Sequence, residues 1–205
     1  GTPSDLIPRS MRPCGSEQGA DAKIVCMLTD PTLVQDVQLL GKHWDVKQLL
    51  TDVANKGYNA LIDIGAIITG FDNEQVARFV LDKSVSFTAA VFLDPQDRKM
   101  AVTRSGGPAF PFEQLGVPAI KRFTFFDQYH TTGMDIKQDS TARAAVLIGK
   151  GTTLRDQAQG CWRMRGLDIG QTLFLIVVPE VQKMIKDAVE ASASAAETDL
   201  IHHVW

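Results

Sequence analysis

The chain has 205 residues, of which 44% are hydrophobic and 22% are charged, and its formal net charge is −3. These values are ordinary for a folded domain and exclude a disordered or fibrous chain. No apolar run approaches the roughly 20 residues that cross a bilayer, so we expect no membrane partner. A pI near 5.8 argues against a dedicated, sequence-independent nucleic-acid binder. Three cysteines are too few for a disulfide framework, so we expect an intracellular protein of the cytoplasm or nucleus.

The N-terminal segment, residues 1–35, is predicted to be a connector. Residues 1–22 contain three prolines and three glycines and show neither an apolar period nor a signal peptide. The chain begins without Met and ends in Val204-Trp205, so we expect a fragment of a longer protein. We predict one α/β domain over residues 36–190, followed by a linker over 191–205.

Short apolar runs of strand length alternate with helical patterns along residues 36–190. The predicted strands are 60–63, 88–93, 122–126, 144–148 and 172–178, with a hairpin strand at 100–103 after the turn-like segment 94–97. The predicted helices include Leu49 to Gly57, a helix capped by Asp72 or Asn73, Leu154 to about Arg165, and a last helix near Val181. This alternation predicts a mainly parallel sheet covered on both faces, a three-layer sandwich.

Function in such sheets collects at the carboxyl ends of the strands. The segment Gly149–Thr153 lies at one of these ends and opens a helix, so its backbone N–H groups could hold an anion. The alternative, which the pattern favours, is a plain strand-to-helix turn. The Walker A spacing is missing, so the chain cannot build a complete nucleoside triphosphate site alone.

The segment Asp127-Gln128-Tyr129-His130 follows another strand and has the outline of a Walker B or D-E-x-H box. In such a box the Asp holds Mg²⁺ and a Glu polarises water. Gln128 stands where the Glu is required, and an amide cannot act as a general base. The alternative is that Asp127 and His130 only hydrogen-bond around a strand end.

Two arginines, Arg163 and Arg165, lie close together in a segment suited to burial and need anionic partners. Gln159 lies four residues before Arg163, on the same helix face. Gly160-Cys161-Trp162 offers another chemistry, with Cys161 as a nucleophile and His130 as its partner. Cys161 lies about two turns into its predicted helix, where the dipole no longer favours a thiolate.

Together these motifs resemble the second RecA-like domain of superfamily 2 helicases, a P-loop NTPase-like fold. Thr131, Gly133 and Asp135 match motif V (T-x-G-x-D), and Gln159 and Arg163 match the Gln and first Arg of motif VI (Q-x-x-G-R-x-x-R). Arg165 lies one residue before the second Arg position. The resemblance implies catalytic roles for Arg163, Arg165, Asp127 and His130. It also implies nucleotide contacts from Thr131, Gly133, Asp135 and Gln159, no metal site on this chain alone, and ATP with Mg²⁺ bound only together with a preceding RecA-like domain.

Residues 58–182 also resemble the C-terminal region of a little-characterised family of very large fungal and protist proteins. The shared segments include Asp63-Ile-Gly-Ala66, Asp72 to Ala77, Asp127 to Lys137, Arg163-Met-Arg165 and Val178-Pro-Glu180. Proteins of that family are commonly catalogued as ubiquitin thioesterases, which are cysteine-type deubiquitinases. The resemblance implies ubiquitin or nucleic acid as a further partner.

Three hypotheses follow. The first is a helicase-like RecA domain that is inactive alone and supplies an arginine to a nucleotide held by the missing domain. The second is part of a cysteine-type deubiquitinase that uses Cys161. The third is a scaffold that kept the fold without the chemistry.

Overall fold

The computed structural model describes residues 20–131, 135–167 and 169–202. Eight strands form one mixed sheet in the order β1-β8-β7-β2-β6-β3-β4-β5. The first six strands in that order are parallel, and the hairpin strands β4 and β5 are antiparallel to their neighbours. The strands are β1 (Val34–Leu39), β2 (Ala60–Asp63), β3 (Ala89–Leu93), β4 (Lys99–Thr103), β5 (Phe110–Pro111), β6 (Arg122–Phe126), β7 (Arg143–Ile148) and β8 (Thr172–Val177).

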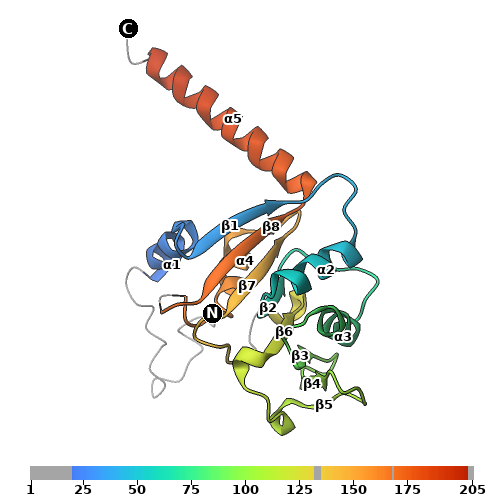
Figure 1. Ribbon diagram of the computed structural model, residues 1–205. Helices are drawn as coiled ribbons and strands as arrows, with labels where there is room; N and C mark the ends of the chain where they lie inside the picture. Colours follow the sequence, from blue (N-terminus) through green and yellow to red (C-terminus); the bar gives the residue numbers. More distant parts are fainter. Residues whose placement is uncertain (1–19, 132–134, 168, 203–205) are drawn as a thin grey trace, which may run out of the picture.

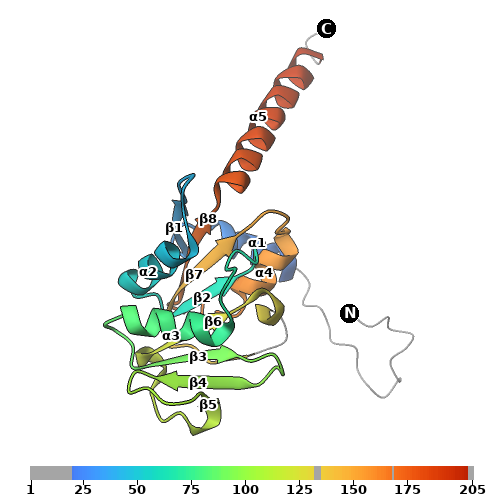
Figure 2. The same cartoon turned by 90° about the vertical axis from the view of Figure 1, so that its right-hand side faces the viewer.

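Helices cover both faces of this sheet (Figures 1 and 2). The α-helices are α1 (Ala20–Thr29), α2 (Val46–Lys56), α3 (Asn73–Lys83), α4 (Leu154–Cys161) and α5 (Pro179–His202), and the short 3₁₀ helices are η2 (Phe112–Gln114), η3 (Ala119–Lys121) and η4 (Gln128–Thr131). The predicted α/β class with a mainly parallel sheet is therefore confirmed. None of the described helices is long and apolar enough to cross a membrane.

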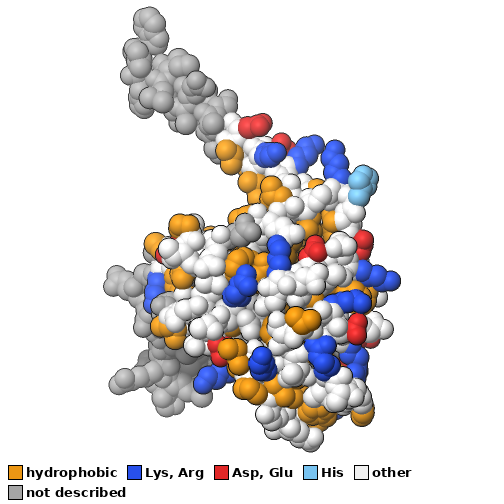
Figure 3. Space-filling model, in the orientation of Figure 1, with side chains coloured by type: hydrophobic (Ala, Val, Ile, Leu, Met, Phe, Trp, Pro, Cys, Tyr) orange, Lys and Arg blue, Asp and Glu red, His pale blue; other side chains and the backbone are white. Residues whose placement is uncertain are grey.

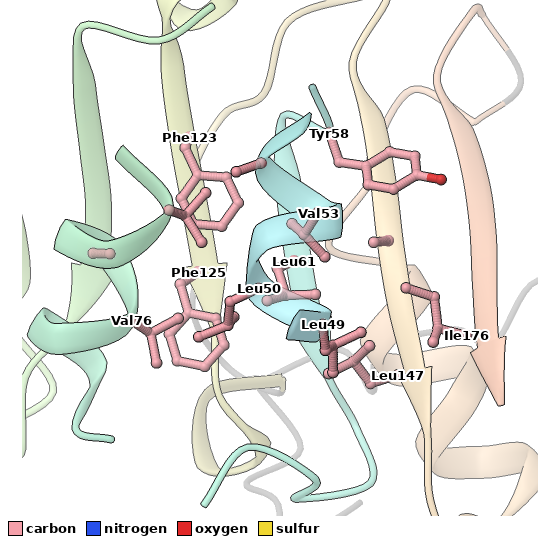
Figure 4. Close-up of a cluster of buried hydrophobic side chains, with 14 of the residues drawn as sticks. Leu49, Leu50, Val53, Tyr58, Leu61, Val76, Phe123, Phe125, Leu147 and Ile176 are labelled. Atoms are coloured by element: carbon pink, nitrogen blue, oxygen red, sulfur yellow. The ribbon is translucent and has the colours of Figure 1, made fainter. Parts of the chain in front are cut away.

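Two buried clusters explain why the sheet needs cover on both sides. Along β2, Leu61 faces the helices α2 and α3, whereas Ala60 and Ile62 belong to the cluster that packs against α1 and α4. This alternation follows from the two-residue period of a strand. Figure 4 shows the first cluster, in which side chains of α2 and α3 meet those of the strands, among them Leu50, Val53, Val76, Leu61, Phe123, Phe125, Leu147 and Ile176.

Local sequence signals fix the ends of the covering helices. Asp45 caps α2 by accepting a hydrogen bond from the Gln48 backbone N–H, and Gly57 ends the helix in the left-handed conformation with φ 65°. Asp72 and Gln75 form a reciprocal capping box at the start of α3. The predicted stop of α2 at Gly57 and the predicted cap of α3 at Asp72 are confirmed, whereas α2 begins at Val46, three residues before the predicted Leu49.

Four further elements, α1, β1, α4 and α5, differ from the predicted boundaries. Helix α1 and the start of β1 lie inside the segment 1–35 predicted as a connector, and α5 runs to His202 across most of the predicted linker. Helix α4 ends at Cys161 instead of near Arg165. The backbone N–H groups of Arg163 and Met164 bond three residues back, at 3.0 and 2.9 Å, so the chain tightens and leaves the α-helical path.

Candidate functional site

The carboxyl ends of β2, β6 and β3 meet at one edge of the sheet, where Asp63 ends β2, Asp127 follows β6 and Asp94 follows β3. A cavity of about 520 Å³ opens there, between the start of α3, the turn joining β3 to β4, and η4. Its lining is Asp72, Asn73, Glu74, Phe92, Leu93, Asp94, Pro95, Asp97, Asp127, Tyr129 and His130. We call it the carboxyl-edge cavity.

His130 contacts two carboxylates in the carboxyl-edge cavity. Its side chain is 9% exposed, its Nδ1 contacts Asp127 Oδ1, and its Nε2 lies 2.9 Å from Asp97 Oδ1. Burial of the ring lowers the pKa of His130, but the hydrogen bonds and charges of Asp97 and Asp127 outweigh burial and raise that pKa above its ordinary value. The site thus favours an imidazolium held between two carboxylates.

Asp97 reaches His130 from a turn that Asp94 organises. The Asp94 carboxylate accepts hydrogen bonds from the backbone N–H groups of Gln96 and Arg98 and from the Arg98 guanidinium. Burial opposes ionisation of Asp94, yet these contacts hold its pKa below the ordinary value. Asp97 itself adopts φ 58°, a left-handed conformation that Asp and Asn tolerate better than most residues. The turn itself is expected from residues 94–97, whereas no local pattern marks Asp97 as a site residue.

Asp63 holds the loop that follows β2. Its two carboxylate oxygens each accept a backbone N–H, from Ile67 and Ile68, both at 2.9 Å. Burial raises the pKa of Asp63, and these two hydrogen bonds act in the opposite direction. The carboxylate is therefore engaged in shaping the loop.

Gly65 and Gly149 contact each other at the point where two neighbouring strands connect to helices on opposite faces of the sheet. The connection after β2 leads to α3 on one face, and the connection after β7 leads to α4 on the other, so the loops separate between β2 and β7. Open α/β sheets commonly bind ligands in the crevice at such a point. Here a Cβ on Gly65 would lie 2.3 Å from the Gly149 nitrogen, so the two backbones are in direct contact and close the crevice.

The Gly149–Thr153 turn was a predicted anion site, with a plain turn as the alternative. In the structure Thr153 caps α4, and the Asp156 carboxylate accepts hydrogen bonds from the Thr153 N–H at 3.0 Å and its hydroxyl at 2.7 Å. A carboxylate of the chain therefore already occupies the start of α4, where a bound anion would be favoured.

A second pocket, of about 360 Å³, lies at the opposite, amino edge of the sheet and shares no lining residue with the carboxyl-edge cavity. We call it the amino-edge pocket, and its lining is Asp135, Lys137, Gln138, Ser140, Arg165, Gly166, Ile169 and Gln171. Arg165 Nε lies 3.8 Å from Asp135 Oδ1. The buried Gln171 side chain supports the wall by accepting from the Gly166 N–H and donating to the Asp139 carbonyl, both at 2.7 Å.

The structure thus divides the predicted site residues between two edges. Asp127 and His130 meet at the carboxyl edge, whereas Asp135 and Arg165 meet at the amino edge. The remaining predicted residues are placed as follows: Arg163 is buried, Gln159 is half-buried on α4, Thr131 ends η4, and the side chain of Thr131 and all of Gly133 lie outside the described residues. Burial lowers the pKa of Arg163, as does Arg165, while Asp135 opposes the change.

Cys161 lies in the second buried cluster and is 1% exposed. Burial raises the pKa of its thiol to about 12. Both ring nitrogens of His130, its proposed partner, are directed at carboxylates. A thiolate nucleophile is therefore disfavoured at this position.

The described part of the chain contains no group of three or more His, Cys, Asp or Glu side chains placed to hold a metal ion. Two carboxylates at the carboxyl edge already have partners: Asp63 accepts two backbone N–H groups, and Asp127 contacts His130. These residues do not fit Mg²⁺ without donors from elsewhere.

Charged side chains give no strong indication of a polyanionic partner on the face seen in Figure 3. Lys and Arg are spread over this face and do not form one continuous patch. Comparisons with protein-family models, curated proteins and solved structures found no match to the chain.

Proposed function

We propose that the chain is a RecA-like, helicase-like domain that completes a nucleotide site together with a preceding domain of the same parent protein and is inactive alone. The supporting observation is the meeting of Asp135 and Arg165 in the amino-edge pocket. They belong to the two segments that resemble helicase motifs V and VI, and 30 positions separate them in the sequence.

The two arginines have different roles in this proposal. Arg165 is about half exposed, at 49% of its side chain, so its guanidinium can turn from Asp135 toward a phosphate of a bound nucleotide. Arg163 is 8% exposed and adds positive charge behind the pocket wall. A guanidinium suits phosphate because its planar fork donates two parallel hydrogen bonds. Asp135 would accept from a sugar hydroxyl once Arg165 has moved.

ATP fits this pocket only in part. Lys137 and Arg165 line the pocket together with one carboxylate, Asp135, so an anionic ligand is favoured. The sequence, however, contains no loop with the Walker A spacing. The preceding domain would supply that loop and the ligands of Mg²⁺. Asp127 and His130 lie at the other edge, and we assign them no role in nucleotide binding.

The test is ATP hydrolysis by the parent protein carrying Arg165→Ala, with Arg155→Ala, at an exposed position of α4, as the matched control. An arginine that stabilises transferred phosphate contributes about 10³-fold or more to the rate, so we expect a loss of that size in Arg165→Ala alone. Equal rates in the two variants would refute the assignment.

The same preparations separate the other hypotheses. Labelling of the wild type by a ubiquitin probe, abolished by Cys161→Ala, would replace the proposal with a cysteine-type deubiquitinase. A parent protein with neither activity would leave a scaffold that binds ubiquitin, nucleic acid or another partner without chemistry.

A further inference from the structure

We propose that the contact between Asp97 and His130 is a proton-dependent latch that closes the carboxyl-edge cavity when the imidazole is charged and releases the β3–β4 turn when it is neutral. The latch joins two segments that lie side by side, since β3 and β6 are neighbours in the sheet (Figure 2).

The number of N–H donors on the His130 ring decides whether both carboxylate contacts are favourable. Each ring nitrogen of His130 faces a carboxylate oxygen, and a carboxylate can only accept. An imidazolium carries two N–H donors and satisfies both carboxylates, whereas a neutral imidazole has one donor and one lone pair. Loss of the proton therefore turns one of the two contacts into a repulsion between a lone pair and an anion.

The Asp97 contact is the one expected to break. Asp127 lies three residues before His130 on the same segment, and its side chain is 23% exposed. Asp97 belongs to a separate turn, and its side chain is 79% exposed, so water can solvate it once it is released. Because Asp97 and His130 both line the cavity, their separation widens its mouth.

Other charged groups around His130 are already engaged. Asp94 of the same turn pairs with Arg98, and Asp63 at the end of β2 binds two N–H groups. On α3, across the cavity, Asp72 caps the helix and Glu74 pairs with Arg78. On α4, Asp156 bonds to Thr153, and Arg155 is the charged neighbour of Asp156. The proton on His130 is therefore governed chiefly by Asp97 and Asp127, which raise its pKa.

Two variants separate the latch from a merely structural contact. In Asp97→Asn the amide suits the left-handed backbone and can flip, accepting from an N–H or donating to a lone pair. The turn should then stay closed at all pH values. In His130→Phe both contacts are lost while the turn sequence is intact, so the turn should be open at all pH values. Asp82→Asn, an exposed change on α3 away from the cavity, is the control of equal charge.

The measurements are the NMR titration of the His130 ring and, in the same samples, the Overhauser contact between that ring and the Asp97 side chain. The amides of Gln96, Asp97 and Arg98 are bonded to Asp94 and so do not report on the latch. We expect the wild type to lose the Overhauser contact as His130 titrates, at a midpoint above the ordinary 6.5. Asp97→Asn should lower that midpoint and keep the contact on both sides of it. A wild-type contact that persists above the midpoint, or an unchanged midpoint in Asp97→Asn, would overturn the latch.

Discussion

Replacing Gly65 by Ala tests the closed crevice between β2 and β7. The new Cβ would lie 2.3 Å from the Gly149 nitrogen and 2.5 Å from its Cα, so the two loops must separate by about 1 Å to reach ordinary contact. Both obstructing atoms are backbone, so no side-chain rotation relieves the clash. Overpacking of this kind costs about 3 kcal/mol, and the shift also strains the hydrogen bond from Gly65 N–H to the Leu147 carbonyl.

Urea and thermal unfolding followed by circular dichroism measure this cost. For a chain of this size, about 3 kcal/mol corresponds to a fall in Tm of about 6–12 °C. The control is Gly41→Ala, where an added Cβ meets nothing within 4 Å. Its stability should match that of the wild type or exceed it by up to about 1 kcal/mol. If Gly65→Ala were as stable as Gly41→Ala, the two loops would not be in contact.

Three further predictions concern buried groups. At a pKa of about 12 rather than 9.0, the buried Cys161 should carry about 10³-fold less thiolate than an ordinary cysteine. After alkylation at mild alkaline pH, mass spectrometry should therefore find the exposed Cys26 modified long before Cys161. Similar rates at the two cysteines would contradict the burial of Cys161. Gln171→Leu leaves the buried Gly166 N–H without its acceptor, whereas the Asp139 carbonyl still accepts from the Ala142 N–H. The change should cost about 1–3 kcal/mol in urea unfolding, so a cost below about 0.5 kcal/mol would contradict the bridge. Because the pKa of His130 is raised by folding, its contribution to stability is complete below 6.5 and is lost as the pH rises through the folded-state pKa. The free energy of unfolding should therefore fall over that range in the wild type and less in Asp97→Asn.

The sequence predicted the central strands well because they are buried on both faces. The run 144–148 is continuous and apolar, and 122–126 carries three phenylalanines around Thr124; the structure places β7 and β6 there. Strand β1 was missed for the opposite reason. It lies at the edge of the sheet, with Val37 and Leu39 about half exposed and glutamines between the apolar residues, so its pattern is weak. The length of α4 depends on a tightened turn that helix periodicity does not reveal.

The candidate sites were predictable only within single segments. The contact of Asp127 with His130 spans three residues and is visible as a local pattern, including the alternative that the pair only hydrogen-bonds at a strand end. Asp97 comes from a different hairpin, and its approach depends on β3 lying beside β6. The fold also places Asp135 and Arg165 at the opposite edge of the sheet from Asp127 and His130. The motifs that contain these four residues were expected to form one site.

The pairing of β1 with β8 bears on how the chain folds during synthesis. Strand β8 lies between β1 and β7, and Val34 pairs with Leu173, about 140 residues later. At about 5–20 residues per second, the ribosome needs roughly 7–28 s to make that distance. Strand β1 therefore has no place in the sheet until nearly all of the domain has emerged. Strand β7 ends only 24 residues before β8 begins, so its edge stays open for about 1–5 s. A chaperone that binds extended segments would have its longest opportunity at β1.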